Sequence, residues 1–450
     1  MTATAGNAPA AAAPADAPTF SRPYTRYVLW LLLGINVVNF LDRQVVNILA
    51  EPIKRDLKIS DTQLGLMTGL AFAIFYTILG LPIARLADRK NRATIIGCSA
   101  AIWSAFTALC GQAQNFVQLV LFRIGVGVGE AGCLPPSQSL IVDYVAKEKR
   151  GSALAFFSMG SSIGTLLGMV LGGLVADAYG WRTAFLIAGA PGLVFAVLAL
   201  TTLREPRRVL AAHGRQVAAN QTTFKATFVY LTAKRTFWLL AAGAAIKSLI
   251  SYGQTPFIIS FFLRNHAEEL TQLAAVVGLK PMGFLGLVLG VVGGVFGTLG
   301  SFLGGWLADR AARKDVSKVL AIPALATLGG VPFVTISVLL DPVLAALALY
   351  SVSVVLITMW HGPTWGTMHS MVPSEMRATA TAIMLLIINF VGLGLGPLAV
   401  GALSDLMNYG LGLGSAEGVR WALIASSGLG VLSFACFWAG RRTAVRDTID

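Results

Sequence analysis

Five charged side chains interrupt long apolar runs of this 450-residue chain: Asp42, Arg43, Arg123, Glu130 and Lys247. A charged Arg, Lys or Asp at the middle of a membrane-spanning helix costs about 2.5–3.5 kcal/mol on insertion scales. We therefore expect all five to pair with one another or to line a water-filled cavity. Two acids beside two arginines offer two kinds of chemistry, namely the binding and release of a proton and the holding of an anion.

Helical spacing groups four of these charges. Asn39 and Arg43 are four residues apart and belong to a polar stripe on one helical face, with Asp42 beside it. Arg123 and Glu130 are seven residues apart, which places them two turns apart on one face of another helix. Two short polar faces of this kind suit the inner surface of a helical bundle.

Three interpretations of this cluster remain open. The acids and bases could simply neutralise one another, they could bind and release protons as part of a coupling mechanism, or they could contact a substrate. Burial raises the pKa of a carboxylate and a nearby arginine lowers it, so an acid held between these effects can bind a proton in one conformation and lose it in another. We predict that Asp42 and Glu130 are proton-coupling acids and that Arg123 tunes them.

A second set of residues could bind an anionic headgroup. Arg43 offers a bidentate fork and Lys247 a point charge, and we add Asn39, Tyr252 and His361 as predicted substrate contacts. The alternative for Lys247 is that it reaches the membrane interface or pairs with a backbone carbonyl. The alternative for His361 is a buried, hydrogen-bonded role, because no acidic or cysteine partner for metal or catalytic chemistry stands near it.

The composition places these residues in a membrane protein. Charged residues make up 12% of the chain, against about 25% in soluble domains, and hydrophobic residues make up 56%. The net charge of +13 would suggest nucleic acid in a soluble protein, but here it is better explained by basic cytoplasmic loops, so no nucleic-acid partner is expected. The four cysteines have no metal-binding spacing, and no phosphate-binding loop for ATP is present.

Apolar runs separated by short polar breaks predict twelve transmembrane helices in two six-helix halves, an all-α membrane fold. The halves span 27–203 and 236–440, joined by a cytoplasmic linker at 204–235 and flanked by a disordered tail at 1–26 and a short tail at 441–450. The helices are predicted at 27–50, 62–84, 93–112, 116–142, 151–176, 182–203, 237–263, 283–306, 317–340, 343–370, 378–404 and 419–440. Placing both termini in the cytoplasm puts 24 Lys and Arg residues inside and 7 outside, which favours that orientation.

Three sequence echoes indicate that the halves are duplicates. Leu-Ala-Asp-Arg occurs at Leu86–Arg89 and again at Leu307–Arg310, a separation close to half the chain. At nearly the same separation, Glu148–Ala153 is echoed at Glu375–Ala380, and Gly172–Asp177 is echoed at Val400–Asp405. Two duplicated membrane halves around a central site are typical of a carrier.

The repeated loop resembles the signature of the major facilitator superfamily, Gly-x-Leu-Ala-Asp-Arg-x-Gly-Arg-Arg. Ala84 and Asn91 replace two of its glycines in the first copy, and the second copy keeps Gly305. Two stretches are further similar to the Spinster branch of lipid transporters: Asn39 to Arg43, and a second one made of Arg123 to Gly127, Gly129 to Ala131 and Pro135. An Asp-Arg pair in the first helix also occurs in organic-anion symporters, so Glu130-Ala131 carries most of the distinction.

The resemblance implies a secondary transporter, not an enzyme, in which the halves rock around a central cavity. It implies proton coupling without a cofactor or metal, a monomer in the plasma or inner membrane, and an anionic amphipathic substrate of lysophospholipid or sphingosine-phosphate type. The alternative is a proton-coupled symporter of small organic anions. It also implies a cytoplasmic gate in which Asp88 and Asp309 meet the starts of the eleventh and fifth helices, made from Asp88, Arg89, Arg92, Asp309 and Arg310.

Overall fold

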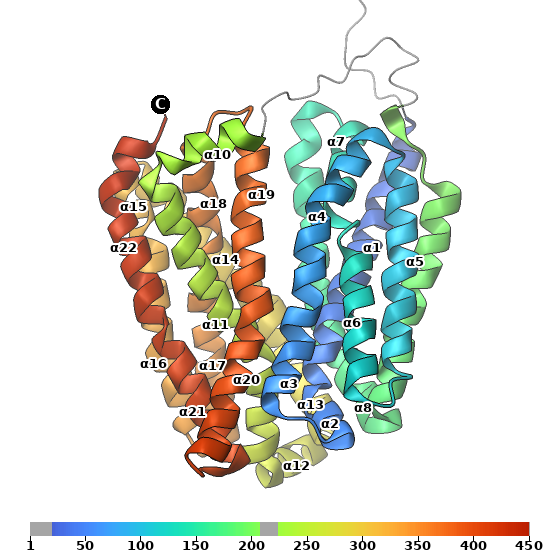
Figure 1. Cartoon of the computed structure of the whole chain (residues 1–450), viewed down its shortest axis with the longest axis vertical. Helices are drawn as coiled ribbons and strands as arrows, with labels where there is room; N and C mark the ends of the chain where they lie inside the picture. Colours follow the sequence, from blue (N-terminus) through green and yellow to red (C-terminus); the bar gives the residue numbers. More distant parts are fainter. Residues whose placement is uncertain (1–19, 208–223, 450) are drawn as a thin grey trace, which may run out of the picture.

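The computed structural model of the chain describes residues 20–207 and 224–449, and within them the side chains of Leu81, Asp88 and Val316 lie outside the description. The described residues are helical, with short connections (Figure 1). The N-terminal half consists of α1 (Arg22–Ile48), α2 (Ala50–Leu57), α3 (Asp61–Gly65), α4 (Ala71–Arg89), α5 (Arg92–Cys110), α6 (Phe116–Glu130), α7 (Leu134–Tyr144) and α8 (Arg150–Thr202).

The C-terminal half follows the same plan. It consists of α10 (Phe224–Thr232), α11 (Arg235–Asn265), α12 (Ala267–Val276), α13 (Pro281–Val291), α14 (Gly297–Ala312), α15 (Val316–Val319), α16 (Ala321–Leu339), α17 (Val343–Thr358), α18 (His361–Ser370), α19 (Arg377–Ile388), α20 (Gly396–Asp405), α21 (Gly414–Gly428) and α22 (Gly430–Asp447). Wider π-helical turns at Leu66–Leu70, Val292–Phe296 and Asn389–Leu395 join several of these pieces into single membrane-spanning rods, and a fourth turn, Leu406–Gly410, extends the end of α20.

These helices make twelve membrane passes. Ten helical stretches are long and apolar enough to cross a bilayer. One of them, α8, turns back at Gly180, whose φ of 84° is a left-handed conformation that glycine adopts without steric cost, so it crosses twice. The 31-residue helix α11, which carries Lys247 in its middle, supplies the twelfth pass. Figure 1 shows the passes gathered into two side-by-side bundles, one from each half of the sequence.

The ends of the predicted segments differ from the structure in three places. Helix α1 begins at Arg22, with a proline in its first turn, so residues 22–26 belong to the first helix and not to the tail. Helix α10 lies inside the predicted linker, and α22 continues to Asp447, beyond the predicted end at 440. Residues 1–19 of the tail and 208–223 of the linker lie outside the described residues.

The two halves are joined by an ion cluster at the end of the molecule that carries α2, α3 and α12, which we call the closed end. Arg264 of α11 lies 2.8 Å from carboxylate oxygens of both Glu51 and Asp61 in the other half, and all three side chains are buried. Lys54 lies 2.6 Å from Asp61, and the Ser404 hydroxyl donates to Asp61 across the interface at 2.7 Å. One carboxylate therefore ties its own helix, α3, to three others, α2, α11 and α20.

We expect Arg264→Gln to destabilise the folded protein by about 3 kcal/mol, since it leaves two buried carboxylates short of a counter-ion and only Lys54 remains on Asp61. Thermal unfolding in detergent should show a midpoint several degrees below that of the wild type. The matched control is Arg55→Gln, because Arg55 also pairs with Glu51 but is exposed and stays within one half. Equal midpoints for the two variants would contradict a structural role for Arg264.

Candidate functional site

Arg43 of α1 and Glu130 of α6 form an ion pair in the core of the N-terminal half. The Arg43 Nε atom lies 2.6 Å from Glu130 Oε2. The Glu130 side chain is fully buried, whereas 16% of the Arg43 side chain remains exposed. The arginine therefore stands between the acid and the space at the centre of the protein.

Aromatic rings hold the two arginines of the site. The guanidinium carbon of Arg43 lies 5.1 Å from the Phe72 ring centroid and 4.6 Å from that of Tyr76. The guanidinium carbon of Arg123 lies 5.2 Å from the same Phe72 ring. Because ring faces attract cations without neutralising them, Phe72 lets two positive charges lie near each other while both keep their capacity to bind an anion.

Several polar atoms of this cluster are buried without a partner among the described residues. Asp42 accepts one hydrogen bond, from the Thr107 hydroxyl at 3.1 Å, and its second carboxylate oxygen has none. The same holds for the second oxygen of Glu130, the Arg123 Nε atom and the Asn39 amide nitrogen. Buried polar groups are nearly always satisfied in proteins, so this concentration of unused donors and acceptors marks the place where a proton or ligand would add bonds.

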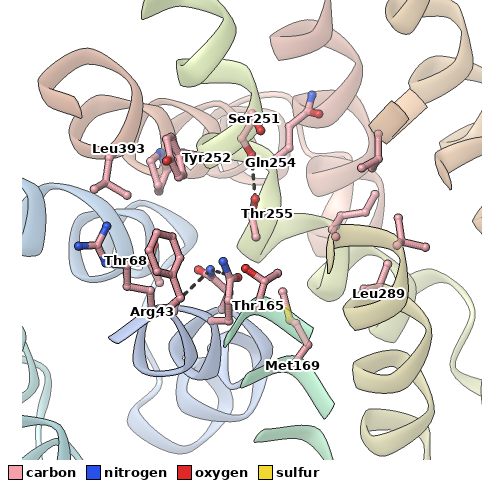
Figure 2. Close-up of a pocket in the computed structure, with 18 of the residues that line it drawn as sticks. Arg43, Thr68, Thr165, Met169, Ser251, Tyr252, Gln254, Thr255, Leu289 and Leu393 are labelled. Atoms are coloured by element: carbon pink, nitrogen blue, oxygen red, sulfur yellow. Dashed lines mark hydrogen bonds between the residues drawn. The ribbon is translucent and has the colours of Figure 1, made fainter. Parts of the chain in front are cut away.

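A cavity of about 210 Å³ lies between the halves, with Arg43 and Arg123 in its wall. Figure 2 shows side chains of the two halves facing each other across it. The N-terminal half supplies Phe40, Arg43, Gln44, Asn47, Thr68, Phe72, Arg123, Thr165 and Met169. The C-terminal half supplies Ser251, Tyr252, Gln254, Thr255, Ile258, Leu289, Val292, Gly293, Tyr350, Val354, Ile357, Thr358, Leu393 and Pro397.

The charges of the cavity wall are unevenly distributed. Both cations come from the N-terminal half, and the wall that faces them is uncharged, a mixture of hydroxyl and aliphatic groups. Three of the π-helical turns supply wall residues, among them Thr68, Val292 and Leu393. A widened turn bends a helix and re-aims its side chains, and such turns are frequent at functional sites. The arrangement can hold an anion at one pole and apolar groups at the other.

Of the predicted substrate contacts, Arg43 and Tyr252 line this cavity, whereas Asn39 is buried and does not line it. Lys247 is buried too and has no hydrogen-bond or ionic partner among the described residues, but it lines a separate, smaller pocket that shares Gln254 and Ile357 with the main one. The ring of His361 stacks on that of Trp360 at 4.2 Å, outside the lining of the main cavity. The predicted set is therefore only partly brought together.

The repeated loop residues lie at the end opposite the closed end. Arg92 is fully buried, donating from Nε to Glu205 at 3.1 Å and lying 2.7 Å from Asp143. Although burial opposes ionisation of Glu205, the hydrogen bonds from Arg92 hold its pKa below the ordinary value. Arg92 therefore fastens the first repeated loop to its own half.

The second loop is less engaged. Asp309 is exposed, and its carboxylate has no partner among the described residues. The guanidinium of Arg310 lies 5.8 Å from the Trp306 ring, and Arg89 is exposed. The side chain of Asp88 lies outside the described residues.

Sequence reasoning missed several residues that the structure brings to the site. Phe72, Tyr76 and Thr107 read as ordinary residues of apolar helices, and only the fold reveals that they contact the charges. The closed-end cluster did leave a signal, because Glu51, Asp61 and Arg264 are charged residues at the borders of predicted spans. All three residues lie in predicted loops, and a loop sequence does not indicate which residues of the two halves form ion pairs.

Comparison with known proteins agrees with this architecture. Residues 32–397 match the family model of the Major Facilitator Superfamily. The chain is 30% identical to an MFS-type efflux pump of Mycolicibacterium smegmatis over 94% of each protein, and 24% identical to the hexuronate transporter of Bacillus subtilis over 86% of this chain and 89% of that one.

Among solved structures, a bacterial homolog of the human lysosomal transporter Spinster, in an inward-facing and unoccupied conformation, superimposes with a TM-score of 0.85. It is 30% identical, and the match covers 96% of this chain and 100% of that one. The expectations of a twelve-helix fold, of a transporter rather than an enzyme, and of a resemblance to the Spinster branch are confirmed. The chain belongs to the major facilitator superfamily.

Proposed function

We propose that this transporter couples the movement of protons to that of an amphipathic anion, of the lysophospholipid or sphingosine-phosphate type, by alternating access. The observation that carries the proposal is the Arg43–Glu130 pair, in which the arginine faces the cavity and the acid lies behind it. A substrate anion that enters the cavity competes with Glu130 for the same guanidinium. The substrate and the acid are thereby linked through one side chain.

This competition provides a route to coupling. Once Arg43 turns to the substrate, Glu130 is left as a buried carboxylate without a counter-ion, and binding a proton removes that cost. Asp42 already lacks an ion-pair partner among the described residues, so it is a second group on which a proton is favoured. Arg123, held against Phe72, supplies positive potential to both acids. The proton and the anion then cross together with less net charge than either alone.

The cavity suits an amphipathic substrate. The anionic group would lie against Arg43 and Arg123, where the guanidinium fork gives two parallel hydrogen bonds to a phosphate or carboxylate. The apolar part would lie along Met169, Leu289 and Val292. A sphingosine-1-phosphate transporter of Danio rerio, 33% identical over 38% of this chain and 35% of that protein, supports this substrate class.

We further propose that both termini are cytoplasmic, which makes the closed end extracellular and the conformation inward-facing. The distribution of basic residues supports this orientation, and so does the similarity to the inward-facing Spinster homolog. Asp88 and Asp309 would then close the cytoplasmic side in the opposite conformation, each on a helix start of the other half. The exposed carboxylate of Asp309, without a partner among the described residues, fits a gate that is open in this conformation.

A second candidate substrate is a small organic anion. Gln44, Asn47, Ser251 and Thr255 line the cavity and could hydrogen-bond the hydroxyls of a sugar acid. The hexuronate transporter among the relatives is consistent with this alternative. Such a carrier would use the same arginines but would discriminate by hydroxyl groups rather than by an acyl chain.

Uptake of a labelled lysophospholipid into proteoliposomes tests the function directly. We expect an inward-directed proton gradient to accelerate uptake by the wild type, and Asp42→Asn and Glu130→Gln each to lose most of this acceleration, because an amide side chain cannot bind and release the coupled proton. The control is Glu148→Gln, which removes an exposed acid far from the cavity.

Gradient-driven uptake that survives intact in both variants would overturn the coupling role. If folded wild type moves no lysophospholipid but takes up hexuronate under the same gradient, the second substrate class replaces the first and the coupling mechanism stands.

Substrate affinity should depend on Arg43 far more than on Lys247. Arg43→Ala removes a charge-assisted hydrogen bond worth about 1.5–3 kcal/mol, which corresponds to a rise in the Kd of the lysophospholipid of roughly 10- to 150-fold. Lys247→Met should change the Kd less than about threefold, because Lys247 lines the smaller pocket. Isothermal titration or ligand-induced thermal shift would measure both. A larger effect for Lys247→Met would move the anion site into the C-terminal half.

A further inference from the structure

Two acidic residues, one from each half, cap helix starts of the opposite half at the closed end. The Asp405 carboxylate, at the end of α20, accepts from the backbone N–H of Asp61 at 3.1 Å and that of Thr62 at 2.7 Å, and from the Thr62 hydroxyl at 2.6 Å. These are the first two residues of α3, whose N–H groups have no partner within the helix. The start of this helix is therefore capped from both halves, by Asp405 at its first two N–H groups and by Ser60 at the N–H of Gln63.

Asp177 does the same in the reverse direction. It lies near the end of the first pass of α8, three residues before the break at Gly180. Its carboxylate accepts from the backbone N–H of Gly283, in the first turn of α13, at 2.5 Å. The Lys280 ammonium, just before α13, donates to the Asp177 carbonyl at 2.9 Å.

The duplication relates these two contacts. Asp177 and Asp405 are the last residues of Gly172–Asp177 and of its echo in the second half, so they occupy equivalent positions. The two capped helices start at Asp61 and Pro281, and the rods that they begin run on to the two copies of Leu-Ala-Asp-Arg. Each of these rods therefore carries an acid near its far end and receives one at its start.

Glycines at matching positions bring the helices close enough for the caps to reach. A Cβ on Gly173 would lie 2.5 Å from the Met282 carbonyl oxygen, and one on Gly401 would lie closer still to that of Asp61. A Cβ on Gly286 or on Gly65 would collide with the partner backbone in the same way. Gly173 and Gly401 are equivalent in one echo, and Gly65 and Gly286 precede the two Leu-Ala-Asp-Arg copies by the same spacing. The duplication therefore also preserves the backbone-to-backbone approach.

We propose that Asp177 and Asp405 are a pair of gate residues that hold the closed end shut and release it as the opposite end closes. One helix pair consists of α8 and the rod formed by α13 and α14. At the closed end Asp177 caps the start of α13, and at the opposite end Asp309 of α14 would meet the start of α8. In the second pair, Asp405 caps α3, and the rod that starts with α3 carries Asp88 near the end of α4. Each transition then exchanges one carboxylate-to-helix contact for another at the far end of the same two helices.

The two gate contacts differ in strength. Asp405 accepts from three donors and lies beside Asp61, which is held by Arg264, Lys54 and Ser404. The Asp177 carboxylate accepts from the backbone N–H of Gly283, its carbonyl accepts from Lys280, and no buried ion cluster of the described residues lies beside it. The interface of α8 with α13 should therefore release before that of α20 with α3.

Distance measurements on spin labels test the proposal without reference to any substrate. One label replaces Gln112, in the loop between α5 and α6, and the other replaces Val276, at the end of α12; both positions are exposed, lie at the closed end and are away from the gate contacts. The four native cysteines are replaced beforehand. The measured quantity is the ratio of two populations of the protein in nanodiscs, those with a long and those with a short distance between the two spin labels.

We expect Asp405→Asn to raise this ratio roughly tenfold and Asp177→Asn roughly threefold, the sizes expected for losing charge-assisted hydrogen bonds of unequal number. The matched control is Asp56→Asn, which removes an acid at the same end whose ion pair with Arg182 stays within one half, so the ratio should not change. Adding Asp309→Asn to Asp177→Asn should return the ratio toward the wild-type value, because both ends of one helix pair then lose their caps.

Ratios for Asp177→Asn and Asp405→Asn that match the Asp56→Asn control would overturn the proposal. If Asp405→Asn does not fold, Thr62→Val removes one of its donors from the opposite half and should shift the ratio in the same direction by a smaller factor. An unchanged ratio in that folded variant would equally count against a gate. A failure of lysophospholipid transport would leave these distances unaffected and so bears only on the substrate.

Discussion

The cost of placing a charge inside a bilayer is the constraint on which the rest of this structure depends. The N-terminal half buries Asp42, Arg123 and Glu130 almost completely, and each would be prohibitive alone. They are tolerated because α1 and α6 bring two acids and two arginines together, with Glu130 paired to Arg43. The Phe72 ring also lies against both arginines, and the Tyr76 ring lies against Arg43. The glycines of α6 serve this arrangement, since a Cβ on Gly127 would collide with the Phe72 backbone at 2.5 Å. The pairing of the buried charges therefore depends on the close packing of these helices.

The two halves share a fold but divide the work. The sequence echoes and the paired glycines at the closed end keep the symmetry of the duplication, which suits parts that must move in the same way. The cavity wall has lost that symmetry, because both of its cations come from the first half and the second half contributes hydroxyl and aliphatic groups. The duplication is therefore retained in the helix contacts of the closed end and lost in the wall of the cavity.

Much of the fold could be predicted from the sequence, because helix length and apolar composition in a membrane leave few alternatives. The Arg43–Glu130 contact was within reach as well, since helical spacing put both residues on inward faces. The position of Lys247 and His361 outside the main cavity could not be predicted, because a single polar residue on an apolar helix does not reveal which face of the helix points to the cavity. The pairing of Arg264 with Asp61 could not be predicted either, because it depends on how the two halves pack against each other and produces no periodic pattern in the sequence. Long-range contacts between helix ends are set by tertiary packing, not by local pattern.

The crowding of bonds on Asp61 has a consequence for kinetics. Its carboxylate is bonded to Arg264, Lys54 and Ser404, and its backbone N–H is bonded to Asp405. Because these contacts share one residue, the free-energy cost of breaking one of them depends on whether the others are intact. Partial rupture leaves a buried carboxylate with fewer partners, which is less stable than either the intact or the fully hydrated cluster. The route between conformations therefore passes through a sharp barrier rather than a gradual slope, and the protein should dwell in discrete states separated by brief crossings.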